Sequence, residues 1–189
     1  GSAPLLPPIA GLKDRIDNEN HNIYSILGMI SHINDFPKDL EGKKVVVVGG
    51  GAVGLDVVEF FADRNADISI VEMMDQIGRD LDPVSKNDTK TMMKKHNVHQ
   101  LTKTALLEVK DSSFLVKGDG EPYELPFKYG FVCLGMRAQG QLYQNLTEEF
   151  SSEDVEIMNI GDSQRARRII DGTQEGRNIL TILEQKGYL

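Results

Sequence analysis

The sequence predicts a three-layer α/β fold with a parallel β-sheet and an antiparallel β-meander inserted between its parallel strands. Three observations predict this fold. Four consecutive valines at 45–48 are typical of a strand that is buried on both faces of a parallel sheet. An amphipathic helix pattern and a second apolar run at 68–71 follow, which together indicate a βαβ unit. Turn residues then divide 98–126 into short strands, which indicates the meander.

The segment before the βαβ unit is expected to contribute little regular structure. Residues 1–12 are rich in proline and glycine, which predicts an extended segment rather than a helix or a central strand. Apolar residues at helical spacing predict a helix within 22–33. Residues 34–44 contain a proline and a glycine, and we expect a loop there.

The remaining elements follow in order along the chain. Asp82 is expected to be the N-cap of a helix, because Pro83 stands at the first helical position. The predicted elements are a strand at 44–48, a helix at 52–65, a strand at 67–72, a helix at 83–96, meander strands at 105–109, 113–116 and 123–125, a strand at 129–134, a short helix at 141–146, a strand at 155–160 and a helix at 169–186.

A glycine-rich turn connects the valine strand to the helix that follows it. Gly49 permits a sharp turn, Gly51 lets an anion approach the backbone, and Gly54 lets the helix pack closely on the sheet. Free N–H groups and the helix dipole can then bind a pyrophosphate, which predicts a Rossmann-like dinucleotide site. The candidate cofactor-binding residues of this turn are Gly49, Gly50, Gly51, Ala52, Val53 and Gly54.

Glu72 ends the second strand of the βαβ unit and is the candidate ribose ligand. Its carboxylate can accept hydrogen bonds from both ribose hydroxyls and would repel a 2′-phosphate. Met73, a further candidate, offers no positive charge, so NAD(H) is favoured over NADP(H), although Arg79 could swing toward a phosphate. Two alternatives stay open: a site for S-adenosylmethionine or another adenosine ligand, and a glycine-rich turn with an ordinary surface glutamate.

Composition restricts the class of protein further. A chain of 189 residues is long enough for one domain, or for a domain and part of another. The net charge of −8 argues against nucleic-acid binding, and no apolar run is long enough to cross a membrane. The single cysteine, Cys133, excludes an internal disulfide. We therefore expect a cytoplasmic protein that binds neither nucleic acid nor membrane.

No side chain is identified as a catalytic acid, base or nucleophile. Cys133 lies within an apolar strand pattern and is expected to be a core residue. His96 and His99 have no third ligand nearby in the sequence, so we expect no metal site. Hydride transfer to or from a nicotinamide would need no such group, because the cofactor carries that chemistry.

Segment 49–62 resembles the NADH-binding segment of the flavoproteins with two dinucleotide-binding domains, which include the pyridine nucleotide-disulfide oxidoreductases. Three other stretches are similar to motifs of the same superfamily. Residues 1–11 resemble its first crossover motif, residues 132–137 its second, and residues 160–176 its flavin-side Gly-Asp motif and helix. The sequence is most similar to NADH:flavin oxidoreductases of the NADH oxidase, 2,4-dienoyl-CoA reductase and 2-enoate reductase type.

This resemblance implies a fragment of a larger enzyme that binds NAD(H) and FAD. Residues 40–130 would form the NAD(H)-binding domain, while 1–39 and 131–189 would flank it as segments of an incomplete FAD-type domain. Gly135 would approach the nucleotide, and Asp162 would contact the flavin cofactor. The missing N-terminal flavin domains would be partners of this chain, and FMN and an iron–sulfur cluster could lie further upstream in the parent enzyme.

The implied function is delivery of hydride from NADH to a flavin in the parent enzyme. The fragment alone would lack the hydride acceptor and would be inactive. Apolar surface left uncovered on the flanking segments would favour a homodimer. The alternative is a stand-alone NAD(H)-binding sensor module without catalysis.

Overall fold

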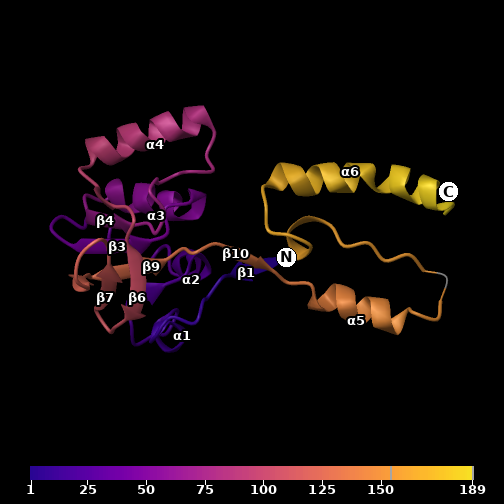
Figure 1. Cartoon of the computed structure of the whole chain (residues 1–189), viewed down its shortest axis with the longest axis horizontal. Coiled ribbons are helices and arrows are strands. Elements are labelled where there is room, and N and C mark those ends of the chain that lie inside the picture. The colour runs from indigo at the N-terminus through magenta and orange to yellow at the C-terminus, as the bar shows by residue number, and fades with distance from the viewer. Residues whose placement is uncertain (154, 189) are drawn as a thin grey trace. The chain divides into compact units, whose positions relative to one another are not determined.

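The computed structural model describes residues 1–153 and 155–188, and the chain forms two compact units (Figure 1). One unit is Pro4–Gly135, and the other combines Gly1–Ala3 with Met136–Leu189. The unit Pro4–Gly135 is larger than the range 40–130 expected for the NAD(H)-binding domain. The functional assignment of each range stays a prediction.

A parallel sheet of five strands lies at the centre of the unit Pro4–Gly135. In spatial order its strands are β2 (Ile23–Tyr24), β9 (Tyr129–Val132), β3 (Lys44–Val48), β4 (Asp67–Val71) and β5 (His99–Leu101). Val45 of β3 lies opposite Ile68 of β4 on one side and Tyr129 of β9 on the other. The chain thus leaves β3 toward one edge and returns on its other side, which places a topological switch point at the carboxyl end of β3.

The valines of β3 pack alternately on the two faces of the sheet, which confirms a strand that is buried on both sides. Val45 and Val47 belong to a core formed with helix α3 (Ala52–Ala62). Val46 and Val48 belong to a second core formed with the antiparallel sheet. This alternation follows from the two-residue period of a strand. The predicted three-layer α/β architecture is confirmed: helices pack on one face of the parallel sheet, and the antiparallel sheet packs on the other face together with one short helix.

The predicted meander is confirmed as an antiparallel sheet with the order β6-β7-β8. These strands are β6 (Ala105–Val109), β7 (Ser113–Lys117) and β8 (Tyr123–Pro126). The parallel sheet is flanked by the helices α1 (Leu12–Arg15), α2 (Ile26–Ser31) and α4 (Pro83–Lys95). Met29 of α2 and Met93 of α4 enter the core around α3, whereas Leu12 of α1 enters the core around the meander.

The single helix expected within 22–33 was wrong at its start. Ile23 and Tyr24 instead form strand β2, because they pair with Gly130 and Phe131 at the edge of the parallel sheet. Helix α2 begins only after Ser25, whose Oγ accepts a hydrogen bond from the Gly28 N–H at 3.2 Å. Pairing with a strand that is distant in sequence therefore overrides the local helical spacing.

The unit of Gly1–Ala3 and Met136–Leu189 contains less packed structure. Its elements are the two-stranded sheet of β1 (Ser2–Pro4) and β10 (Met136–Ala138), helix α5 (Gln141–Glu149), the short 3₁₀ helix η1 (Gly161–Ser163) and helix α6 (Ile169–Lys186). The strand expected at 155–160 was wrong, and these residues have no regular structure. A strand needs a neighbour to complete its hydrogen bonds, and the described residues of this unit provide none for 155–160. No helix in the described part of the chain combines the length and apolar character needed to cross a membrane.

Replacing Asp82 by alanine is expected to lower the melting temperature by a few degrees. Asp82 caps α4 as predicted, because its Oδ1 accepts hydrogen bonds from the N–H groups of Val84 at 3.0 Å and Ser85 at 3.1 Å. The Ser85 side-chain hydrogen bond, followed by its backbone hydrogen bond, lowers the pKa of Asp82. The stabilisation is therefore present above the unfolded pKa of about 4 and is lost as the pH falls through the lower folded pKa.

Thermal unfolding of the Asp82→Ala variant and of the unaltered chain, at neutral and at acidic pH, measures this effect. Asp80→Ala is the control, since Asp80 lies in the loop before the cap. The difference in melting temperature should shrink in acid. A difference that does not depend on pH would contradict the role of the ionised carboxylate.

Candidate functional site

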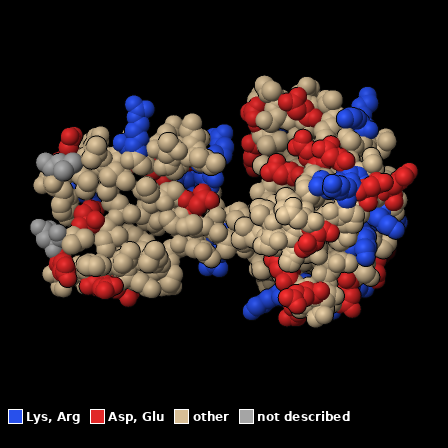
Figure 2. Space-filling model, turned by 180° about the vertical axis from the view of Figure 1, so that it is seen from behind, with Lys and Arg blue, Asp and Glu red and all other residues tan. Residues whose placement is uncertain are grey.

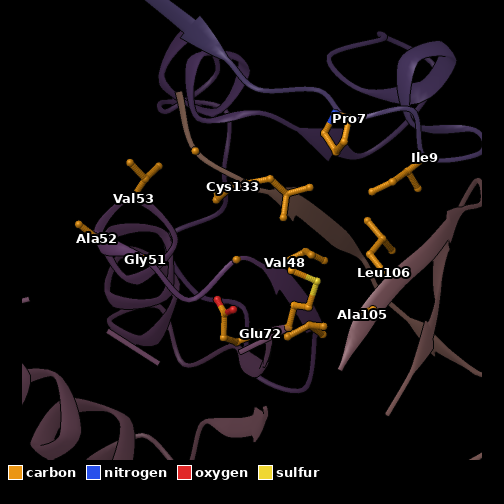
Figure 3. Close-up of a pocket in the computed structure, with 15 residues that line it drawn as sticks. Pro7, Ile9, Val48, Gly51, Ala52, Val53, Glu72, Ala105, Leu106 and Cys133 are labelled. Carbon is orange, nitrogen blue, oxygen red and sulfur yellow. The ribbon is translucent and has the colours of Figure 1, made fainter. Parts of the chain in front are cut away.

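A cavity of about 590 Å³ lies within the unit Pro4–Gly135, where β3, β4 and β9 end (Figure 3). Its position is the crevice at which open α/β sheets bind ligands, and its size suits a small organic ligand. The residues predicted for the site that line this cavity are Gly49, Gly51, Ala52, Val53, Glu72, Met73 and Gly135. Gly50 and Gly54 belong to the same turn and support it from outside the lining.

Two glycines of the turn are required by close backbone contacts. Gly49 has φ +108°, and a Cβ there would lie 2.2 Å from the Cys133 carbonyl oxygen. A Cβ on Gly54 would lie 1.9 Å from the Gly49 carbonyl oxygen. The Gly49 N–H also donates to the Val71 carbonyl at 2.8 Å, which ties the turn to β4. Glycine at these positions lets helix α3 start directly against the ends of the strands.

The start of helix α3 leaves backbone donors free beside the cavity. Gly51 is the N-cap, no side chain caps the helix, and its first turn holds no acidic residue. Within the part of the chain that the structure describes, the N–H groups of Gly51, Ala52 and Val53 have no acceptor. A Cβ on Gly51 would meet nothing within 4 Å, so there is room for a ligand to reach the backbone. Unpaired donors and the helix dipole at an open surface fit a pyrophosphate.

The Glu72 carboxylate lies next to this turn and is held by two backbone donors. Its Oε2 accepts a hydrogen bond from the Gly50 N–H at 2.6 Å, and its Oε1 accepts one from the Met74 N–H at 2.7 Å. An ionised carboxylate has about four lone-pair sites, so both oxygens keep capacity for further donors. The backbone of Glu72 is fixed as well, because its N–H donates to Leu101 and its carbonyl accepts from Thr104. This arrangement fits a ribose diol.

An apolar wall completes the cavity and was missed by the sequence analysis. Pro7 and Ile9 approach from the N-terminal segment, and Ala105 and Leu106 come from the start of β6 (Figure 3). The two segments are joined by a parallel β-bridge between Ala10 and Glu108. The Pro/Gly-rich composition of 1–12 indicated an extended segment, but no local signal could place it opposite β6. The wall offers apolar contact to the rings of a nucleotide.

Gly135 and Asp162 fall in different units. Gly135 has φ +105° and lines the cavity, and its approach to the nucleotide stays a prediction. Asp162 accepts hydrogen bonds from the Arg167 N–H at 3.2 Å and from Ser2 Oγ at 2.9 Å. These donors, the Arg167 N–H first, hold the pKa of the Asp162 carboxyl below its usual value. The contact of Asp162 with a flavin cofactor stays a prediction.

The basic cluster at 165–168 contacts acidic side chains of its own unit. The Arg167 guanidinium contacts Glu175, whose other carboxylate oxygen accepts the Gly161 N–H, and Arg168 lies beside Asp171. Elsewhere, Lys and Arg side chains are interspersed with Asp and Glu over the face that Figure 2 shows. The charges of Arg167 and Arg168 are thus engaged within the chain.

The two histidines singled out in the sequence contribute to the surface. His99 Nε2 lies 3.4 Å from an Asp67 carboxylate oxygen, across neighbouring strands. His96 ends helix α4 as its C-cap residue. Among the described residues, no three His, Cys, Asp or Glu side chains are grouped so that they could hold a metal ion.

Cys133 is expected to react slowly with thiol reagents in the folded chain. It is buried, and burial, with a smaller contribution from the charge of Asp56, raises its pKa from 9.0 to about 12. The thiolate is the reactive form, and very little of it exists at about pH 8. Because the folded state holds this proton more tightly than the unfolded state, stability should fall as the pH rises from about 9 toward 12.

Alkylation of the native chain and of the chain unfolded in urea, both at about pH 8, measures this difference. The unfolded chain serves as the control for intrinsic reactivity. Equal rates in the two states would show that Cys133 is accessible and ionised in the folded protein.

The layered fold and the position of the cavity define an α/β protein of the dinucleotide-binding class. The family model for pyridine nucleotide-disulphide oxidoreductase matches residues 1–159, and the chain belongs to this family. The resemblance found in the sequence motifs is therefore confirmed. Membership of this family and the similarity to the NADH oxidase described below support NAD(H) and a flavin as the cofactors.

Similar proteins are longer than this chain. An NADH oxidase of Thermoanaerobacter brockii is 26% identical over 177 residues, which are 93% of this chain and 26% of that protein. A bilirubin reductase of Mediterraneibacter gnavus is 26% identical over 179 residues, which are 93% of this chain and 25% of that protein. The chain thus spans about a quarter of the length of these curated relatives.

Solved structures with the same fold are also longer. A 2-naphthoyl-CoA reductase superposes with a TM-score of 0.76 at 20% identity, covering 93% of this chain and 25% of its own. Histamine dehydrogenase from Rhizobium sp. 4-9 superposes with a TM-score of 0.74 at 14% identity, covering 95% of this chain and 29% of its own. At these identities the likeness establishes the fold.

Proposed function

We propose that the cavity binds NAD(H) and that, in a longer protein, the bound NADH delivers hydride to a flavin. One observation carries this proposal. The Glu72 carboxylate is hydrogen-bonded to Gly50 of the turn that opens helix α3. The carboxylate that would bind the ribose and the uncapped N-terminus of α3 are thereby held next to each other, as the binding of one adenine dinucleotide requires. The similarity to an NADH oxidase supports the nicotinamide form of that dinucleotide.

In this function the chain binds and orients, because the nicotinamide supplies the hydride. The free N–H groups of Gly51, Ala52 and Val53 would hold the pyrophosphate. Glu72 would accept hydrogen bonds from the ribose hydroxyls and would repel a 2′-phosphate, which favours NAD(H) over NADP(H). The apolar wall formed by Pro7, Ile9, Ala105 and Leu106 would exclude water from the bound rings.

Titration of the chain with NADH, followed by nucleotide fluorescence, tests this function. The chain contains no tryptophan, so protein fluorescence adds little background. We expect NADH to bind more tightly than NADPH. S-adenosylmethionine, measured by calorimetry, should bind much more weakly than NADH. No binding of NADH, or tighter binding of S-adenosylmethionine, would reject the proposal.

We further propose that residues 40–130 form the nucleotide-binding domain, and that the flanking ranges 1–39 and 131–189 contribute to a flavin layer completed by other parts of a longer protein. The length of the relatives supports this proposal. Exposed apolar side chains on α6 also support it, since Ile169 is 90% and Leu180 is 64% exposed. With free flavin added, the chain alone should oxidise NADH no faster than the free flavin does without the chain. Turnover by the isolated chain would contradict this division of roles.

We propose that the longer protein is of the NADH oxidase, enoate reductase or dienoyl-CoA reductase type. Such a parent enzyme would add FMN and an iron–sulfur cluster upstream.

The same exposed apolar surface of 136–189 favours a homodimer of the isolated chain. Sedimentation velocity over a range of concentrations tests the dimer. A constant monomer mass would contradict it.

A further inference from the structure

Gly50 is held by the loop that follows β4, residues 72–81. Glu72 Oε2 accepts the Gly50 N–H at 2.6 Å. The Gly78 N–H donates to the Gly50 carbonyl oxygen at 2.7 Å. Ile77 covers the same residue, since its Cγ1 lies 3.1 Å from the place where a Cβ on Gly50 would stand. One loop thus contacts the amide, the carbonyl and the α-carbon of Gly50.

The contact with the Gly50 carbonyl determines where the Gly51 N–H points. A trans peptide is planar, so its carbonyl oxygen and its N–H point in opposite directions. No peptide bond of the described chain is cis. Because the Gly78 N–H holds the Gly50 carbonyl, the Gly51 N–H is directed away from the loop. That N–H has no acceptor among the described residues, and Gly51 itself lines the cavity.

A peptide flanked by two glycines needs such a restraint. Glycine permits more backbone conformations than any other residue, so the Gly50–Gly51 plane can rotate at low cost. A rotated peptide would present a carbonyl oxygen, instead of an N–H, to an approaching anion. The oxygen would repel the pyrophosphate that the N–H would bind.

Gly78 can make its contact because of its own backbone conformation. It has φ +65° and is buried, and the Leu81 N–H donates to its carbonyl oxygen at 3.1 Å. The loop therefore turns sharply at Gly78 and directs its N–H at Gly50. We propose that Gly78 is a positioning residue for the cofactor pyrophosphate, acting through the Gly50 carbonyl without touching the ligand. This inference rests on the proposed NAD(H) site.

The test compares two alanine variants with matched backbone strain. Gly78→Ala forces a side chain onto a residue with φ +65° and should displace its N–H from Gly50. Gly42→Ala is the control, because Gly42 has φ +68° with nothing within 4 Å of a Cβ. Gly42 lies before the amino end of β3, whereas the cavity lies at the carboxyl end.

The ligands are NADH, ADP and adenosine, of which only adenosine lacks phosphate. Gly78→Ala should weaken NADH and ADP about tenfold, which corresponds to about 1.4 kcal/mol. Adenosine affinity should stay unchanged, because its ribose meets Glu72 and not the Gly51 N–H. Gly42→Ala should leave the affinity for all three ligands unchanged. This split between ligands is a readout that a general loss of structure would not produce.

Two results would overturn the inference. They are an equal loss of adenosine and ADP affinity in Gly78→Ala, and unchanged affinity for every ligand. If Gly78→Ala does not fold, Ile77→Ala provides the same comparison without backbone strain. We expect it to weaken ADP by about threefold and to spare adenosine, as befits the loss of packing over Gly50. Failure of the unaltered chain to bind NADH would reject the proposed function itself, which is a distinguishable outcome.

Discussion

Replacing Gly54 by alanine is expected to lower the free energy of unfolding of the unit Pro4–Gly135 by about 3 kcal/mol or more. The new Cβ would stand 1.9 Å from the carbonyl oxygen of Gly49 and 3.1 Å from its carbonyl carbon. Both atoms are backbone, and Gly49 is anchored to Val71 by a hydrogen bond of 2.8 Å. Helix α3 would have to move away from the strand ends and would lose packing against the core. Urea unfolding followed by circular dichroism measures this loss.

Gly51→Ala is the matched control for Gly54→Ala. Gly51 lies in the same turn, but a Cβ there would meet nothing within 4 Å, and its φ of −79° suits alanine. The free energy of unfolding of Gly51→Ala should fall by less than about 1 kcal/mol, which is the cost of a poorer N-cap. Its NADH affinity should fall, because the methyl group stands where the pyrophosphate approaches. Equal stability of the two variants would contradict the close helix–strand contact at Gly54.

Replacing Glu72 by alanine is expected to weaken NADH binding by about 10- to 100-fold. The change removes the carboxylate proposed to bind the ribose and leaves the N–H groups of Gly50 and Met74 without their acceptor. NADPH binding should fall less, because the repulsion of a 2′-phosphate disappears as well. The preference for NADH over NADPH should therefore narrow.

Affinities for both nucleotides, measured by fluorescence titration, test the prediction for Glu72. Glu59→Ala is the control, since Glu59 is an exposed carboxylate on α3 outside the cavity lining. It should change neither affinity by more than about twofold, as expected for a surface substitution. Unchanged NADH affinity in Glu72→Ala would show that the carboxylate does not contact the ribose.

The sequence predicted the central βαβ unit well because its signals are local. The valines of β3 alternate between two cores, and Gly54 meets the backbone of Gly49, only a few residues earlier in the chain. Glu72 lies at the end of β4, where the apolar run 68–71 placed it. Strand β2 and the wall residues Pro7 and Ile9 were not predicted, because their positions depend on partners far away in the chain.

The strand predicted at 155–160 is wrong because the described residues of its unit provide no strand to pair with it. Its apolar residues suit a strand, but a strand forms only where another can complete its hydrogen bonds. The described residues of its unit form one sheet, of β1 and β10. In the same way, the holding of Gly50 by Gly78 could not be predicted, because a backbone contact between two loops leaves no signal in residue type.

The bridge between Ala10 and Glu108 has a consequence for the order of events during folding. It joins segments at nearly opposite ends of the unit Pro4–Gly135, and the Val109 N–H donates to the Ala10 carbonyl beside it. Closing so long a loop costs more chain entropy than forming the βαβ unit, whose contacts are local. The turn and Glu72 can thus assemble before the apolar wall does. During refolding, the ability to hold a nucleotide should therefore appear later than the helical signal.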